Sequence, residues 1–150
     1  KLLINRHTLV EGNEITGMRD ACGIWLDWAN QHSRVTGNTI REIEAIQGGI
    51  FIEASRVPNL IDHNIIDRID GPGIFGGECE NQIFRHNRVG DCTGPTVEFK
   101  KHTDRHLFNT PLLSRNNEVA HNVFVNMKSI QIGDDPHHFH DNKVAAASRR

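Results

Sequence analysis

Residues 59–66, Asn-Leu-Ile-Asp-His-Asn-Ile-Ile, hold the pattern that decides the fold of this chain. A short run of alternating apolar residues leads into an asparagine, and aliphatic residues follow it. The pattern recurs along the 150-residue sequence. Its other copies are TLVEGNEI (8–15), SRVTGNTI (33–40), QIFRHNRV (82–89), EVAHNVF (118–124) and FHDNKV (139–144). A repeated unit of this kind predicts a solenoid.

The spacing of the repeat indicates which solenoid it is. The asparagines are Asn13, Asn38, Asn64, Asn87, Asn122 and Asn142, and successive ones are 25, 26, 23, 35 and 20 residues apart. One coil of a parallel β-helix takes roughly 20–25 residues. The long step then contains one coil with a loop insertion around residues 100–115. An asparagine at the same turn of every coil can stack as an amide ladder, and it tolerates the left-handed conformation of a sharp turn.

A second repeated unit lies between the asparagine units. It reads GIWLD (23–27), GIFIE (49–53) and GIFGG (73–77), with weaker copies TVEF (96–99) and SIQI (129–132). Each coil therefore has at least two short strands, whose side chains point inward and outward by turns. Residues 39–47 have some helical character, but a turn segment is favoured there.

An antiparallel sandwich or barrel is the main alternative fold. Its hairpins would need Asn-Gly or Asp-Gly turns, and Asp70-Gly71, followed by Pro72, is the only such pair. The sequence thus predicts an all-β, right-handed parallel β-helix of about six coils forming one domain over residues 1–150. Because the chain begins and ends in mid-repeat, we expect it to be a piece of a larger β-helix.

The composition of the chain limits the classes of partner that it is expected to bind. With 17 basic and 19 acidic residues and a net charge of −2, the chain has no electrostatic case for binding nucleic acid or an anionic membrane. It has no long apolar run and no signal-peptide pattern, and cytoplasmic and secreted locations both stay open. The three cysteines lack metal-site spacing and are interpreted as buried or free thiols.

Two acidic residues occupy the same position in consecutive coils. Asp27 ends the first copy of the second unit and Glu53 ends the next. Parallel strands lie about 4.8 Å apart, so the two carboxyl groups are expected on the order of 5 Å apart, as in retaining glycosidases. A solvated pair of surface acids is the alternative. Stacked like charges are unfavourable, which favours a functional role.

Aromatic residues accompany these acids. The alternation places Trp25 with Asp27, and Phe51 with Glu53, on the outer face of the strands, while Trp28 falls on the inner face. Sugars pack their C–H faces on aromatic rings, so an outward ring beside an acid suits a carbohydrate site.

Four segments together resemble glycoside hydrolase family 120, a family of β-xylosidases built on a right-handed parallel β-helix. They are GIWLDW (23–28), RVTGN (34–38), IFIE (50–53) and LIDHNI (60–65), so the resemblance covers roughly residues 20–66. It implies that Asp27 is the nucleophile and Glu53 the general acid/base, acting on a β-linked pentoside such as a xylo-oligosaccharide. Where the family has Asn-His after the glutamate, this chain has Ala54-Ser55, and a related, fucosidase-like β-helix glycosidase also stays open.

Further residues are candidates for substrate binding beside Trp25, Trp28 and Phe51. An insertion in a solenoid often projects from its binding face, which singles out His102, Arg105 and His106. Glu78 follows Gly76-Gly77, a pair of small residues that leaves room for substrate beside Glu53. For each of these, a solvated loop or surface position is the alternative. A second copy of the chain, or the rest of a longer parent chain, is expected to complete the site.

The segment from Asp134 to His140 is rich in acids and histidines. No zinc spacing is present among Asp134, Asp135, His137, His138 and His140, although the carboxylate oxygens suit Ca²⁺. A polar loop is the favoured interpretation of this segment. No other cofactor is expected.

Two other functions stay open. One is a polysaccharide lyase, with Lys100 or Lys101 as base and Ca²⁺ as its ion. The other is a non-catalytic, carbohydrate-binding or structural segment.

Overall fold

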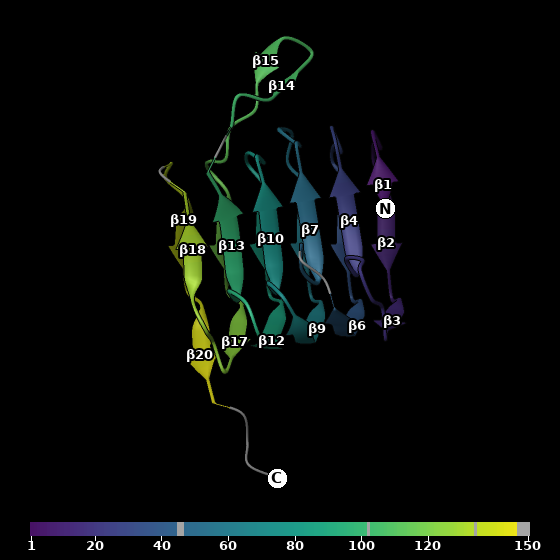
Figure 1. The fold of residues 1–150 in the computed structure, drawn as a ribbon, viewed down its shortest axis with the longest axis vertical. Helices are drawn as coiled ribbons and strands as arrows, with labels where there is room; N and C mark the ends of the chain where they lie inside the picture. Colours follow the sequence, from purple (N-terminus) through teal and green to yellow (C-terminus); the bar gives the residue numbers. More distant parts are fainter. Residues whose placement is uncertain (45–46, 102, 134, 147–150) are drawn as a thin grey trace.

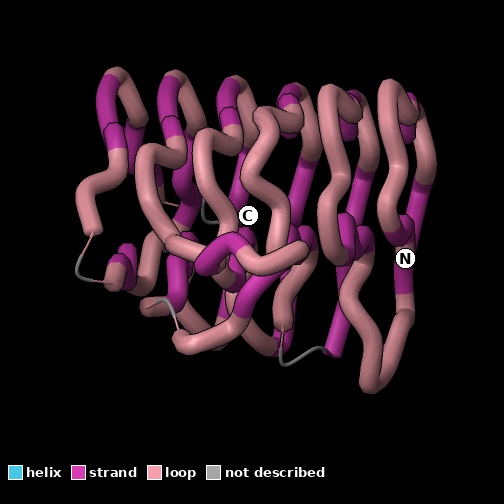
Figure 2. The backbone as a smooth tube through the Cα atoms, turned by 90° about the horizontal axis from the view of Figure 1, so that it is seen from above, coloured by secondary structure: helices cyan, strands magenta, loops and turns pink. Residues whose placement is uncertain are grey.

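The computed structural model describes residues 1–44, 47–101, 103–133 and 135–146, and every regular element in these ranges is a β-strand. The strands form six coils that lie side by side from the N-terminus to the C-terminus (Figure 1). Figure 2 shows the coils from above as a row of stacked loops. This confirms the predicted parallel β-helix.

Three parallel sheets run along the helix, each with one strand from every coil. Sheet one contains β1 (Leu2–Leu3), β4 (Ile24–Asp27), β7 (Ile50–Glu53), β10 (Ile74–Gly77), β13 (Val97–Lys100) and β18 (Ile130–Ile132). Sheet two contains β2 (Leu9–Glu11), β5 (Arg34–Thr36), β8 (Leu60–Asp62), β11 (Ile83–Arg85), β16 (Glu118–Ala120) and β19 (His138–His140). Sheet three contains β3 (Glu14–Thr16), β6 (Thr39–Glu44), β9 (Ile65–Asp70), β12 (Arg88–Cys92), β17 (Val123–Val125) and β20 (Lys143–Ala145).

Each coil has three strands, where the sequence predicted at least two. The asparagine unit contains two strands, one before and one after the asparagine, and both alternate inward and outward. The favoured turn at residues 39–47 is wrong for its first part, because Thr39–Glu44 is strand β6. Ile40 and Ile43 are buried because they point inward from that strand, and Ile40 pairs with Ile66 of the next coil.

The core is built from columns of like residues at one register. In sheet two the column is Val10, Val35, Ile61, Phe84, Val119 and Phe139. The four central members are completely buried. Burial of an aliphatic or aromatic side chain contributes roughly 1.5–3 kcal/mol, so repeated inward residues supply most of the stability of the stack.

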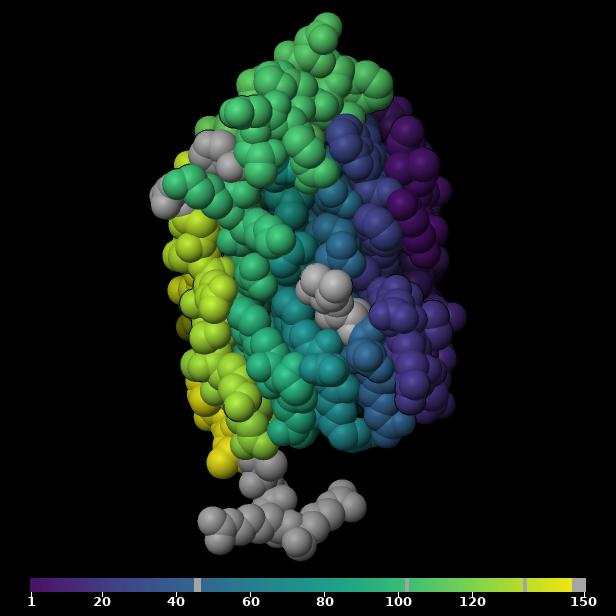
Figure 3. All heavy atoms as spheres, in the orientation of Figure 1, coloured from purple at the N-terminus to yellow at the C-terminus, as the bar shows by residue number. Residues whose placement is uncertain are grey.

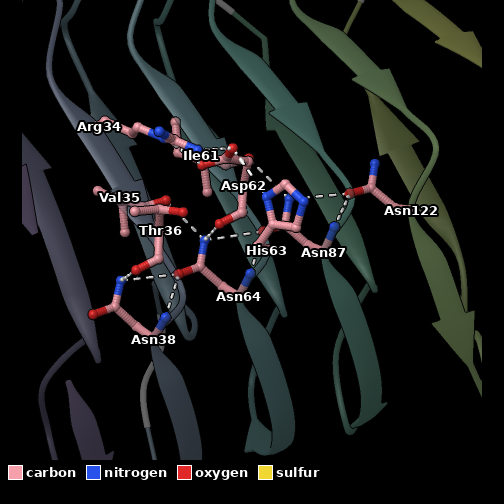
Figure 4. A network of polar contacts seen from close by, with 10 residues as sticks. All are labelled: Arg34, Val35, Thr36, Asn38, Ile61, Asp62, His63, Asn64, Asn87 and Asn122. Carbon is pink, nitrogen blue, oxygen red and sulfur yellow. Dashed lines mark hydrogen bonds and ion pairs between the residues drawn. The ribbon is translucent and has the colours of Figure 1, made fainter. Parts of the chain in front are cut away.

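The asparagine ladder stands at the turn between sheets two and three (Figure 4). The Asn38 side-chain amide donates to Asn64 Oδ1 at 2.9 Å, and the Asn64 amide donates to Asn87 Oδ1 at 3.0 Å. This confirms the predicted ladder. One detail is corrected: the residue before each asparagine has the positive φ, for example His63 at 55° and Gly37 at 64°.

The long coil carries a hairpin formed by β14 (His106–Leu107) and β15 (Thr110–Pro111), which pair antiparallel. The hairpin projects beyond the tips of the sheet-one strands (Figure 1). In the space-filling view it is the green mass across the top of the coils (Figure 3). It therefore adds a wall beside the end of sheet one where Asp27 and Glu53 stand.

Candidate active site

The outer face of sheet one carries a column of aromatic rings. The register pairs Trp25 with Phe51 and Phe51 with Phe75. The ring centroids are 5.3 Å apart in the first pair and 4.9 Å apart in the second. These rings point outward because Ile24, Leu26 and their counterparts fill the core on the alternate positions.

Asp27 stands at the end of β4, one position beyond the Leu26–Ile52 pair, and Glu53 stands at the end of β7 on the next coil. The Asp27 side chain is buried, and its Oδ2 lies 2.7 Å from Lys1 Nζ. The Lys1 ammonium also lies 3.9 Å from the centre of the Trp25 ring. The other oxygen of Asp27 has no hydrogen-bond partner among the described residues. One lysine thus covers both the acid and the ring beside it.

Glu53 is linked to the hairpin. Arg105 Nη1 lies 2.6 Å from Glu53 Oε1, and the same guanidinium contacts the Glu78 carboxylate. Thr103 donates to Glu78 through its backbone N–H at 2.8 Å and through its hydroxyl. Burial by itself raises the pKa of Glu78, but the hydrogen bonds from Arg105 and Thr103 outweigh it and lower that pKa. Glu78 is therefore held as a carboxylate that anchors the hairpin.

Trp28 is not on the inner face as the alternation predicted. Strand β4 ends at Asp27, and the backbone turns at Trp28, where φ is 25°. Its ring is half-buried and lies 5.6 Å from the Arg105 guanidinium carbon. The alternation fails there because it holds only while the backbone stays extended.

These residues border a groove of about 410 Å³. Of the predicted site residues, it is lined by Trp25, Phe51, Glu53, Glu78 and Arg105. Asp27 and Trp28 stand beside it without lining it. His106 is exposed on the hairpin, with Nδ1 2.9 Å from the Asp104 carbonyl oxygen, and is also outside the lining. His102 lies outside the described residues.

From the sequence, Lys100 and Lys101 were predicted as the base of a lyase, and Gly77 as a small residue that leaves room for substrate. The remaining lining residues include these three and others that the sequence did not single out. They are Gln47, Phe75, Gly77, Lys100, Lys101 and Thr103. Phe75 was detectable, because it stands at the same place in its unit as Trp25 and Phe51. Gly77 leaves the outer face open beside Phe51 and Glu53, whereas Gly76 faces the core and makes room for the Phe99 ring. Only one glycine of the pair serves the groove.

A larger hollow of about 600 Å³ shares Gln47 with this groove and is lined by Asp20, Glu44, Gln47, Asp70, Gly71, Thr93 and Gly94. It has acids but no aromatic ring and no basic side chain among its lining residues. The smaller groove on sheet one is the better candidate for carbohydrate chemistry, since rings, acids and bases meet there.

The predicted acid and histidine cluster is dispersed. His137 stacks on Phe99 with ring centroids 4.5 Å apart, and burial lowers its pKa. His140 instead contacts Asp141, with Nδ1 2.8 Å from Oδ2. Asp134 lies outside the described residues.

Cys22, Cys79 and Cys92 are free thiols, and burial raises the pKa of Cys79 to about 12.

The geometry defines a right-handed β-helix protein with a polar and aromatic groove on one sheet. The family model described as right handed beta helix region matches residues 1–75, and the chain belongs to that family. No curated protein and no solved structure matches the chain. Within the described residues, no helix is long and apolar enough to cross a membrane. The β-helix is a fold of carbohydrate-active enzymes, and it is compatible with both glycosidases and lyases.

Proposed function

We propose that this protein is a retaining glycoside hydrolase that cleaves a β-linked pentoside such as a xylo-oligosaccharide. The observation that carries the proposal is the groove on sheet one, where a column of aromatic rings runs beside Glu53 and Asp27 lies on the neighbouring strand. The resemblance of residues 20–66 to the β-xylosidases of glycoside hydrolase family 120 supports the same residues in the same roles.

The ring column supports a carbohydrate substrate. The rings of Trp25, Phe51 and Phe75 form an apolar strip along the groove. Trp25 is half-buried and can pack against the C–H face of a sugar ring, whereas Phe51 and Phe75 are each 4% exposed. Glu53, Gln47 and Lys100 border the strip and can hydrogen-bond sugar hydroxyls. The volume of about 410 Å³ is within the usual range for small-ligand sites.

Asp27 is proposed as the nucleophile and Glu53 as the acid/base. Neighbouring parallel strands are about 4.8 Å apart, which suits the spacing of about 5–5.5 Å between the two carboxyl groups of a retaining enzyme. A carboxylate held in an ion pair is not free to protonate a leaving group. Arg105 must therefore move off Glu53 when substrate binds, and Glu78 gives its guanidinium a second partner.

The test is hydrolysis of 4-nitrophenyl β-D-xyloside by the protein and by Asp27→Asn and Glu53→Gln. Each variant is expected to lose at least about a hundredfold in rate. Glu44→Gln is the matched control, because Glu44 is an exposed acid on sheet three. Undiminished hydrolysis by Asp27→Asn or Glu53→Gln would overturn the proposal. Xylobiose binding without turnover would instead indicate a carbohydrate-binding segment.

A polysaccharide lyase is the second candidate, because Lys100 and Lys101 line the same groove. The Lys100 ammonium lies 5.2 Å from the centre of the Phe75 ring, beside the ring column. A lyase would use a lysine to remove a proton next to a uronate carboxyl group, with Ca²⁺ acidifying that proton. Ultraviolet absorbance from an unsaturated product of a uronate polymer, dependent on Ca²⁺ and lost in Lys100→Met, would favour this candidate.

A further inference from the structure

A column of histidines follows the turn between sheets two and three. His63, His86 and His121 stand at the same place in successive coils, and their ring centroids are 5.2 Å apart in each pair. In the last coil Asp141 takes this place. The shared backbone conformation, with φ of 55° at His121 and 54° at Asp141, directs these side chains to one line on the surface. The column therefore ends with a carboxylate next to an imidazole.

His140 adds a third donor at the end of this column. Its Nδ1 lies 2.8 Å from Asp141 Oδ2, and His121 Nε2 lies 3.9 Å from the same oxygen. One nitrogen or oxygen from each of His121, His140 and Asp141 lies within 4.8 Å of the others, which makes them the one such trio in the described part of the chain. All three side chains are exposed, so an ion could approach from solvent.

The spacing of the donors fits a small divalent ion. Two ligands about 2.0–2.1 Å from a tetrahedral ion stand about 3.3 Å apart. The observed separations of 2.8 Å and 3.9 Å are on either side of this value, so small side-chain rotations complete the geometry.

A supporting contact is present as well. His140 Nε2 lies 3.9 Å from Glu118 Oε1. A histidine that binds a metal through one ring nitrogen usually directs the other to a carboxylate, which fixes the ring and its tautomer. Glu118 stands where it can do this when His140 binds through Nδ1.

We propose that His121, His140 and Asp141 form a binding site for a divalent transition-metal ion such as Zn²⁺. Two imidazoles and one carboxylate favour this class of ion over Ca²⁺, which prefers six to eight oxygens. Water fills the remaining positions. The site lies on the turn between sheets two and three and shares no residue with the groove on sheet one. Of the residues that the sequence singled out for Ca²⁺, only His140 belongs to it.

The test is titration of the metal-free protein with ZnCl₂, followed by calorimetry, with CoCl₂ as a spectroscopic probe. Asp141→Asn, His121→Asn and His140→Gln remove one ligand each. Asparagine is chosen at positions 121 and 141 because it tolerates their left-handed backbone. His32→Asn is the matched control, since His32 has φ of 51° and stacks on His7 in the first two coils.

We expect one Zn²⁺ ion per chain and visible absorption from bound Co²⁺. Each ligand variant should weaken Zn²⁺ binding more than Glu118→Gln, which should weaken it about tenfold, while His32→Asn should leave binding unchanged. Circular dichroism checks that every variant keeps its strands. Absence of binding in the parent protein, or equal binding in all folded variants, would overturn the proposal.

Discussion

Arg105 Nη1 lies 2.6 Å from Glu53 Oε1, although the two residues are 52 positions apart in the sequence. The same guanidinium contacts Glu78, whose side chain is 3% exposed. One arginine therefore pins the hairpin of the long coil to two earlier coils. Its removal would leave a buried carboxylate with Thr103 as its remaining hydrogen-bond partner among the described residues.

Arg105→Met should release the hairpin while the coils stay folded. Methionine keeps much of the side-chain volume, but it removes the charge that compensates Glu78, and an uncompensated buried charge is strongly unfavourable. Limited proteolysis should cut residues 103–114 several-fold faster, with circular dichroism unchanged. Arg68→Met is the control, because Arg68 pairs with exposed Glu42 on sheet three. Equal cleavage of both variants would contradict this prediction.

Asp62 predicts a pH dependence of stability. Its side chain is buried, and burial raises its pKa, but hydrogen bonds from Arg34, Thr36 and His63 lower the pKa from 3.8 to about 2 (Figure 4). A carboxyl group with a lowered folded-state pKa contributes stability above its ordinary pKa, and this stability is lost as pH falls toward 2. Allowing for screening at half-exposed Arg34, the contribution is about 1–2 kcal/mol.

Asp62→Asn should therefore be less stable than the parent protein at pH 7 by about 1–2 kcal/mol. The difference should shrink between pH 4 and pH 2, where Asp62 becomes protonated in the parent protein. Urea denaturation at several pH values measures it, and Asp20→Asn, an exposed acid at a surface turn, is the control. A difference that is constant with pH would show that the ion pair is not its source.

Much of the fold was predictable because each column repeats a residue type. Inward aliphatic residues and the turn asparagines recur in every coil, so the period appears directly in the sequence. A second ladder was missed because its members differ. Asn59 Oδ1 accepts from the Ser33 backbone N–H at 2.9 Å, and Gln82 Oε1 accepts from the Asn59 amide at 2.8 Å. Any side chain with a suitable oxygen can accept the hydrogen bond at this position, so no single residue type recurs along the ladder.

The site was harder to predict for a different reason. Register follows from local pattern, so the placement of Asp27 and Glu53 at the ends of adjacent strands was available from the sequence. Lys1 directly precedes β1, whose register places it beside Trp25. The contacts of Arg105 with Glu53 and Glu78 depend instead on how the inserted hairpin and its flanking segments fold back over sheet one. Nothing in the periodicity specifies those paths, because an inserted loop has no counterpart in the neighbouring coils.

The asparagine ladder should contribute more to the free energy of unfolding in the middle coils than in the first coil. Asn64 Oδ1 accepts from the backbone N–H and the amide of Asn38, and its own amide donates to the Val35 carbonyl oxygen at 2.9 Å. Asn64→Ala leaves these buried groups without hydrogen-bond partners, at a cost of about 1–3 kcal/mol for each one left unsatisfied. Asn13→Ala, at the exposed first coil, should cost about 1 kcal/mol. Thermal unfolding of the two variants provides the comparison, and equal losses would contradict the ladder as a source of stability.

The proposed roles of Asp27 and Glu53 can be separated with azide. In Asp27→Ala, azide takes the place of the missing nucleophile and attacks an activated β-xyloside once, so the product is the α-xylosyl azide. In Glu53→Ala the covalent intermediate still forms from a good leaving group, and azide then attacks it without needing a base. Two inversions give the β-xylosyl azide.

Proton NMR of the anomeric position distinguishes the two products, and the parent protein should gain no rate from azide. The opposite pair of products would reverse the roles. Glu53 would then be the nucleophile, oriented by Arg105 through the 2.6 Å contact. Asp27, with one buried oxygen lacking a partner among the described residues, would be the acid. The stereochemistry of the azide product therefore decides whether the Arg105 contact opposes the reaction or prepares it.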